Sequence, residues 1–243
     1  MGKHPARAEI IEHILQDCGH CVTAILQADT LMIDTITSLY LPFLKRVLTP
    51  TRLLHSMGVM QVMGELAKIY GLDEKRALTT GLLHDAAKDL PAERVQKIVA
   101  EARIKASDPC ERDYVLYQHG PVGAYFVMKE LGVTDLLILD AIYRHTWMGE
   151  HDPMYSPLVW CLRFADILEP NRRWDDAARK IREGEPRLRK AVFAGKLKEA
   201  AFYQTDMLIQ FFNETGKPVH SNYYQAYREL LKEYRSRTNG GAF

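Results

Sequence analysis

The sequence predicts an all-α protein, a helical bundle with an extra helical segment at its N-terminus. Apolar residues recur at helical spacing through most of the chain, in stretches bounded by Pro, Gly, Ser, Thr or Asp. No run shows the sustained alternation of apolar and polar residues that is typical of a half-buried strand. The chain also lacks a repeat of fixed period and a low-complexity linker, so we expect one large domain with an appendage.

The appendage is expected over residues 1–46, and residues 47–243 are expected to form the domain that carries the chemistry. The longest apolar stretch, residues 24–44, is too polar for the roughly 20 apolar residues that a membrane-spanning helix needs. We therefore expect a soluble helix or helix pair there. Three polar residues interrupt this stretch: Gln27, Asp29 and Asp34.

Two helices are expected next, over residues 49–71 and 72–91. The first starts at a Thr-Pro pair and stops at a glycine, and the second has Asp73 as its N-cap and a proline at its end. The sequence LLHDAAKDLP, residues 82–91, is thereby placed within a helix. It sets a histidine and an aspartate side by side in an apolar, alanine-rich stretch.

The rest of the chain continues the helical pattern. Each further stretch is bounded by residues that begin or end helices. Five helices are expected over residues 91–103, 120–132, 134–146, 156–170 and 174–195.

Composition excludes several classes of protein. Lys and Arg number 32 against 31 acidic residues, so a general nucleic-acid binder or an acidic-membrane binder is not expected. The N-terminus lacks the apolar core of a signal peptide, and residue 6 is Ala where a myristoylation signal requires Ser or Thr. We expect a cytoplasmic protein.

The four cysteines, Cys18, Cys21, Cys110 and Cys161, are too few and too dispersed for a disulfide scaffold. The sequence CGHC at 18–21 reads like a thiol-disulfide exchange motif, but that motif needs a preceding strand, and the residues before it are expected to be helical. A metal site there would lack a clear fourth ligand. A helix face that carries cysteines is the preferred interpretation.

Four of the nine histidines fall at the start or end of separate expected helices, and Asp166 adds an acid to an otherwise apolar helix. Side chains of these types on facing helices can form a metal site in the core of a bundle. Imidazole and carboxylate ligands suit iron, manganese and zinc, and the absence of thiolate favours a hydrolytic or redox centre over structural zinc. Spacing alone does not prove such a site. The four histidines are His55, His84, His119 and His145.

The order His55, His84-Asp85, Asp166 resembles the H…HD…D motif of the HD-domain phosphohydrolases. Residues 48–230 are similar to the YqeK-type subgroup, the symmetrical bis(5'-nucleosyl)-tetraphosphatases. The additional His119 and His145 and the sequence EPNR strengthen this resemblance.

The resemblance implies an HD-domain helical bundle and a hydrolase that splits diadenosine tetraphosphate into two ADP. It implies two divalent transition-metal ions, iron in the first place, with manganese or another divalent ion as the alternative. One ion would be held by His55, His84, Asp85 and Asp166. The second would be held by His119, His145 and a bridging Asp85.

Two basic residues are expected to bind the phosphates. Lys88, placed one turn beyond His84 on the same helix face, resembles the lysine of the family's HDxxK variant and is assigned to charge stabilisation. Arg172 of EPNR can engage two phosphate oxygens at once, and the alternative interpretation is an ordinary charged residue after the proline that ends the helix. Asp85 and Lys88 are thus the expected catalytic residues. Weaker candidates are Arg144 and Arg173 for phosphate, and Tyr143 and Trp147 for the adenine pocket.

Two features depart from the family pattern. Residues 147–157, WMGEHDPMYSP with a further His151, replace a short glycine-containing turn and put the substrate preference in doubt. Residues 1–46 are extra. The alternatives to the tetraphosphatase are an HD phosphohydrolase that acts on another nucleotide or cyclic dinucleotide, and a non-catalytic nucleotide-binding module. The expected partners are a nucleotide substrate and, as an option, a second copy of the chain in a homodimer.

Overall fold

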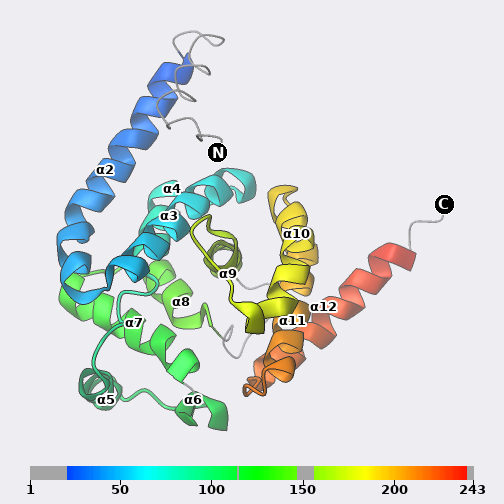
Figure 1. The fold of residues 1–243 in the computed structure, drawn as a ribbon. Coiled ribbons are helices and arrows are strands. Elements are labelled where there is room, and N and C mark those ends of the chain that lie inside the picture. The colour runs from blue at the N-terminus through cyan, green and yellow to red at the C-terminus, as the bar shows by residue number, and fades with distance from the viewer. Residues whose placement is uncertain (1–20, 114, 147–155, 240–243) are drawn as a thin grey trace. The chain divides into compact units, whose positions relative to one another are not determined.

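The computed structural model describes residues 21–113, 115–146 and 156–239, and these contain helices and no strand (Figure 1). The predicted all-α fold is confirmed. The elements are α2 (Cys21–Val47), α3 (Pro50–Tyr70), α4 (Glu74–Leu83), α5 (Ala92–Glu101), α6 (Pro109–Asp113), α7 (Val115–Leu131), α8 (Leu136–Arg144), α9 (Pro157–Leu168), the 3-10 helix η1 (Asp176–Ala178), α10 (Arg179–Phe193), α11 (Leu197–Glu214) and α12 (Ser221–Asn239).

The chain divides into two compact units, Met1–Pro42 and Phe43–Phe243. The apolar stretch expected to be a helix or helix pair belongs to one helix, α2. No described helix is both long and apolar enough to cross a membrane. The extension over residues 1–46 stays a prediction, and the CGHC motif lies outside the residues whose side chains the structure describes.

Helices α3 and α4 pack closely because a glycine lies at their contact. Thr49 caps α3 by accepting a hydrogen bond from the Arg52 N–H, and Asp73 caps α4 in the same way. A Cβ at Gly81 would lie 2.8 Å from the Cα of Met60, so only glycine allows this approach. The close packing brings the start of α3 next to the end of α4.

The helix expected over residues 72–91 is shorter than predicted, because α4 ends at Leu83 and residues 84–89 form turns. His84 Nδ1 lies 2.9 Å from the carbonyl oxygen of Gly81, the group that the N–H of Asp85 would bond if the helix continued. The Lys88 N–H instead donates to the Asp85 carbonyl at 2.9 Å. His84, Asp85 and Lys88 therefore lie on a tight turn and not on one helix face.

Helix α7 begins earlier than predicted, at Val115, and so includes His119. Gly120 lies against α8, since a Cβ there would be 2.6 Å from the carbonyl oxygen of Tyr143. This close approach sets His119 beside the C-terminal end of α8, where His145 is the cap residue.

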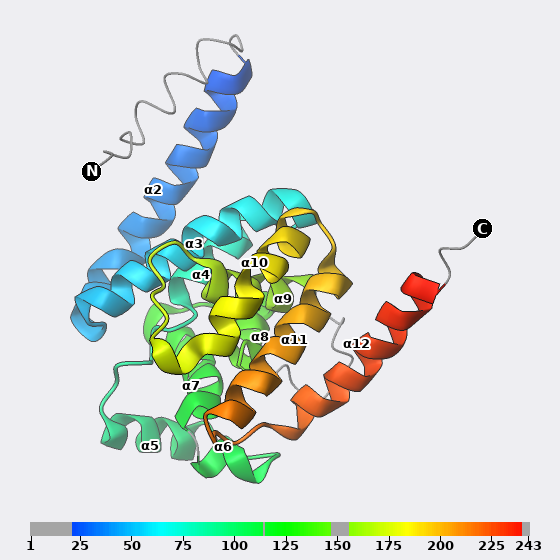
Figure 2. The same cartoon turned by 45° about the vertical axis from the view of Figure 1, so that its right-hand side comes forward.

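Helices α9 to α12 complete the second unit. Trp160 and Phe164 of α9 are fully buried in the apolar core, which α10, α11 and α12 also line. Figures 1 and 2 both show α10 and α11 side by side. The helix expected over residues 174–195 consists of two elements, η1 and α10. Asp175 caps η1 by accepting a hydrogen bond from the Ala178 N–H.

Candidate metal centre

Six side chains that the sequence singled out lie together in the second unit. They come from α3, the turn after α4, α7, the end of α8, and α9. Five are buried, and Asp166 is partly exposed. The six are His55, His84, Asp85, His119, His145 and Asp166.

The two carboxylate oxygens of Asp85 face two different groups of imidazoles. Oδ2 lies 3.8 Å from His55 Nε2 and 3.6 Å from His84 Nε2. Oδ1 lies 3.2 Å from His119 Nε2 and 3.8 Å from His145 Nε2. Each oxygen and its imidazole pair are spaced closely enough to hold one ion. The arrangement therefore fits a bridging carboxylate.

Asp166 joins the first group. Its Oδ1 lies 3.0 Å from His55 Nε2 and 3.8 Å from His84 Nε2. In the second group, His119 Nε2 and His145 Nε2 are 2.9 Å apart. The Nε2 atoms of all four histidines thus point into the cluster.

The backbone fixes the orientation of two of these rings. His84 Nδ1–H donates to Gly81 O, and His145 Nδ1–H donates to Ile142 O at 2.6 Å, since a carbonyl can only accept. Nε2 of each ring then carries the lone pair that can bind a cation. His84 Nε2 is buried without a hydrogen-bond partner among the described residues. Such an unpaired polar atom beside carboxylates fits a metal ligand.

The charge states of three histidines also fit. Burial holds the pKa of His84 below its ordinary value and that of His145 well below it, and burial with the nearby Lys88 ammonium lowers the pKa of His119 to about 4. These rings are neutral at pH 7. Burial opposes ionisation of Asp85, but neighbouring positive groups, Lys88 first, hold its pKa well below the usual range. Neutral imidazoles and an ionised carboxylate are the forms that bind metal.

His55 differs from the other three. Burial lowers its pKa, but hydrogen bonds to Asp166 and Glu169 outweigh burial and raise it to about 9. Without a cation, the carboxylates keep a proton on this ring. A divalent ion bound at Nε2 would replace that proton.

Glu169 is a residue to which the sequence reasoning gave no role. Its Oε1 accepts a hydrogen bond from His55 Nδ1 at 3.1 Å, and its Oε2 accepts one from the Asn171 N–H at 2.7 Å. A Cβ at Gly58 would collide with this carboxylate. The histidine-carboxylate pair orients a ring for a metal ion. Glu169 is the first residue of the EPNR sequence, of which sequence reasoning gave a role only to Arg172.

Three basic side chains surround the acidic cluster. Lys88 Nζ lies 2.9 Å from His119 Nδ1 and 4.0 Å from Asp85 Oδ1. Arg172 Nη1 lies 3.1 Å from Asp166 Oδ1, and Arg52 Nη1 lies 2.8 Å from Asp85 Oδ2. Sequence reasoning named Lys88 and Arg172 and missed Arg52, which as a single arginine at the start of a helix carried no signal. Together they form a positive rim suited to phosphate groups.

The weaker candidates that the structure describes are not among the residues of this cluster or of the neighbouring cavity. Arg144 pairs with Asp140 at 2.6 Å on its own helix, and Arg173 is exposed. Tyr143 is not among the described residues that line the neighbouring cavity. Trp147 and His151, and with them most of the 147–157 segment, lie outside the described residues.

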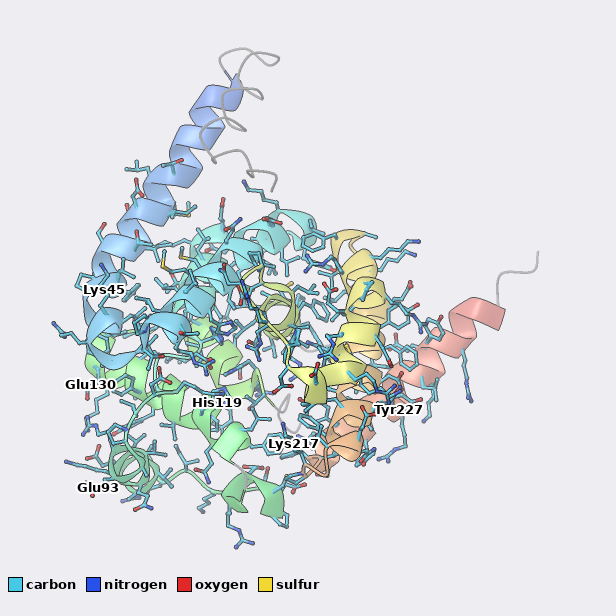
Figure 3. The ribbon with its side chains drawn as sticks, viewed as in Figure 1. Lys45, Glu93, His119, Glu130, Lys217 and Tyr227 are labelled. Carbon is cyan, nitrogen blue, oxygen red and sulfur yellow. The ribbon has the colours of Figure 1, made fainter. Side chains whose placement is uncertain are left out.

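A cavity of about 260 Å³ opens beside the cluster. Metal-group side chains, the three basic residues and side chains from α11 and α12 line it. Figure 3 labels His119 in this part of the unit, with Lys217 and Tyr227 marking the region of α11 and α12. The cavity therefore has the candidate metal centre on one side and residues of α11 and α12 in its walls.

Comparisons with known proteins identify relatives of this chain. The family model described as HD domain matches residues 52–171. A symmetrical bis(5'-nucleosyl)-tetraphosphatase of Bacillus subtilis is 33% identical over 189 residues, which cover 77% of this chain and 93% of that protein. The protein of the same name from Halalkalibacterium halodurans is 29% identical over 195 residues, covering 80% of this chain and 97% of its own.

A solved structure is also similar to this chain. The crystal structure of a Clostridium acetobutylicum protein, described as a predicted HD superfamily hydrolase involved in NAD metabolism, superposes with a TM-score of 0.67 and 30% identity. The match covers 82% of this chain and 97% of that one.

Proposed function

This chain belongs to the HD-domain hydrolases, and we propose that it cleaves diadenosine tetraphosphate symmetrically into two molecules of ADP. One observation carries the proposal: the two oxygens of Asp85 face two separate imidazole groups beneath a rim of basic side chains. The names of the Bacillus and Halalkalibacterium relatives supply the substrate class.

Two divalent ions fit the described residues. His55, His84, Asp85 and Asp166 would hold one, and Asp85, His119 and His145 the other. When bound, a pair of such ions lowers the pKa of a water molecule and neutralises charge on the phosphoryl oxygens. We propose iron, with manganese as the alternative, because both accept mixed imidazole and carboxylate ligands.

The chain's own residues bind and orient the substrate. Lys88, Arg52 and Arg172 are positively charged residues of the cavity lining, and each lies within 4.0 Å of a cluster carboxylate. Phosphate oxygens that enter the cavity would compete for these cations, since a guanidinium or ammonium binds phosphate as readily as carboxylate. Lys88 is then placed to stabilise charge that develops on the attacked phosphate.

Hydrolysis joins the oxygen of water to one of the two central phosphorus atoms and breaks the bond from that phosphorus to the bridging oxygen. One ADP carries the oxygen from water, and the other leaves with the bridging oxygen. Attack at an outer phosphorus would give AMP and ATP instead.

Product analysis tests the proposal. The purified protein is incubated with diadenosine tetraphosphate in heavy-oxygen water, and the products are separated by chromatography and weighed by mass spectrometry. ADP alone, with one label in one of every two molecules, is expected. Asp85→Ala protein prepared in parallel should yield nothing, which excludes a contaminating enzyme.

Two results would contradict the proposal. Equal AMP and ATP would refute the symmetrical cut while leaving the metal centre in place. No cleavage, together with good turnover of another nucleotide or cyclic dinucleotide in a substrate panel, would favour an HD phosphohydrolase of different specificity.

A further inference from the structure

Besides Arg52 Nε, one polar atom in each of three buried side chains of the cavity lining lacks a hydrogen-bond partner among the described residues. The atoms are Nε of Arg163, Oε1 of Gln204 and Oγ1 of Thr146. The three residues are 2%, 1% and 7% exposed, respectively, and all three line the same cavity as the metal-centre residues. Burying a polar atom without a partner is unfavourable, so three of them around one cavity indicate a ligand that supplies the missing bonds.

The orientation of the Gln204 side chain is fixed. Its Nε2 donates a hydrogen bond to the backbone carbonyl oxygen of Arg163 at 2.7 Å. A carbonyl can only accept, so the amide cannot be turned the other way round. The remaining atom, Oε1, is therefore an unsatisfied acceptor that requires a donor from a ligand.

Two hydrogen bonds hold the Arg163 guanidinium, and the part of the chain that the structure describes gives it no counter-ion. Its Nη1 donates to the His145 carbonyl at 2.7 Å, and its Nη2 lies 3.3 Å from the Tyr223 hydroxyl. The guanidinium also lies over the Trp160 ring, 5.1 Å from the centroid. Within the described residues it makes no ion pair with a carboxylate, and its Nε–H is left as a free donor.

The walls near these groups are apolar and aromatic. Leu208, Phe211 and Phe212 of α11 line the cavity, together with Tyr223, whereas the Trp174 ring, also part of the lining, lies 4.4 Å from the Arg172 guanidinium. A phosphate would be poorly placed against such walls, whereas a nucleobase would replace water on apolar surface and stack on aromatic rings. The phosphate-binding cations, Lys88, Arg52 and Arg172, belong to the metal-centre side of the cavity.

We propose that Gln204, Arg163 and Thr146 form a base-recognition subsite for adenine. The Gln204 amide oxygen accepts a hydrogen bond from the 6-amino group, and the Arg163 Nε–H and the Thr146 hydroxyl donate to ring nitrogens. The residues of α11 form its wall. This inference rests on the proposed nucleotide substrate, and it adds that Gln204 determines the preference for an amino-bearing base.

Binding of two diphosphates that differ by one group tests the subsite. Isothermal titration calorimetry of the metal-containing protein compares ADP with purine riboside diphosphate, which lacks only the 6-amino group, and uses inorganic tripolyphosphate as the phosphate probe. Wild-type protein should bind ADP about tenfold more tightly than the purine analogue, because the analogue leaves a buried acceptor unpaired. The Gln204→Leu variant should bind both diphosphates equally and weakly. Its affinity for tripolyphosphate should stay unchanged.

Matched variants keep the test decisive. Gln210→Leu changes an exposed glutamine of the same helix and should leave all affinities unchanged. If Gln204→Leu does not fold, Thr146→Val, which removes one hydroxyl, should still weaken ADP and spare tripolyphosphate. Equal wild-type affinity for ADP and the analogue overturns the subsite. An equal loss of ADP and tripolyphosphate binding in either variant also overturns it, because the groups would then bind phosphate.

The binding test separates this inference from the proposed reaction. Base-selective binding of ADP without cleavage of diadenosine tetraphosphate would support the subsite and refute the proposed function. Symmetrical cleavage without base selectivity would support the proposed function and refute the subsite.

Discussion

His84 and His145 meet edge to face, with ring centroids 5.4 Å apart, although one caps α4 and the other caps α8. Each uses Nδ1 to bind the carbonyl oxygen three residues earlier. The end of each helix therefore orients an imidazole toward Asp85. One histidine belongs to each of the two ligand groups, so their removal should affect different ions.

The first prediction concerns metal content. Protein purified without chelator should contain up to two transition-metal ions per chain, iron foremost, by elemental analysis. His84→Ala and His145→Ala should each lower the metal content, because each removes one ligand from one group. His13→Ala, in the N-terminal segment, serves as the control. Repeated values below one metal per chain, with no activity restored by added metal, would refute the metal centre.

The second prediction separates a metal ligand from a phosphate contact. Asp85→Ala should lose metal and activity together, because both ligand groups share this carboxylate. Lys88→Ala should keep its metal and lose on the order of 10² to 10³ in turnover, the usual effect of removing one transition-state contact. Lys97→Ala removes an exposed lysine and should change neither. Full activity of the Lys88 variant would exclude this residue from the mechanism.

Sequence alone predicts much of this site. The order of His55, His84-Asp85 and Asp166 on separate helices, and the resemblance built on it, name every residue of the cluster. A bundle brings facing side chains together whatever the details of its helix ends. The incorrect end of the second helix therefore did not affect the ligand set.

Other features depend on tertiary contacts and leave no local pattern. The role of Glu169 requires its approach to His55 across 114 residues of sequence, which Gly58 on the same helix as His55 permits. Arg163 and Gln204 resemble ordinary polar residues of amphipathic helices, and only their burial beside a cavity reveals them. The orientation of the two Asp85 oxygens likewise follows from packing and not from spacing.

The third prediction concerns the carboxylate behind His55. Glu169→Gln should weaken metal binding about 10- to 100-fold, because a neutral amide with one acceptor oxygen replaces a charged carboxylate that accepts from both His55 and Asn171. Gly58→Ala should act in the same direction by displacing that carboxylate. Metal affinity is measured by competition with a chromophoric chelator. Glu65→Gln changes an exposed residue on α3, the helix of His55 and Gly58, and is the control. Wild-type metal affinity in both test variants would exclude a positioning role for Glu169.

The last prediction concerns the stability of the metal-free protein as the pH falls. The pKa of His119 is about 4 in the folded chain, below its ordinary 6.5. The unfolded chain therefore takes up a proton near pH 6.5, while the folded chain resists until about pH 4. Stability should be lost across this window, by on the order of 3 kcal/mol for this group. Burial also lowers the pKa of His84 and His145, so protonation of these two rings should reduce stability as the pH falls as well.

His55 has the opposite effect, because its pKa is raised to about 9. Its contribution is complete below pH 6.5 and is lost as the pH rises through 9, so the metal-free protein should be most stable near neutrality. Urea unfolding at pH 5, 7 and 9 measures the loss of stability on both sides of neutral pH. His119→Gln should reduce the loss between pH 7 and 5 and leave the loss between pH 7 and 9 unchanged. If the variant loses as much stability as wild type between pH 7 and 5, protonation of His119 does not cause the loss of stability in acid.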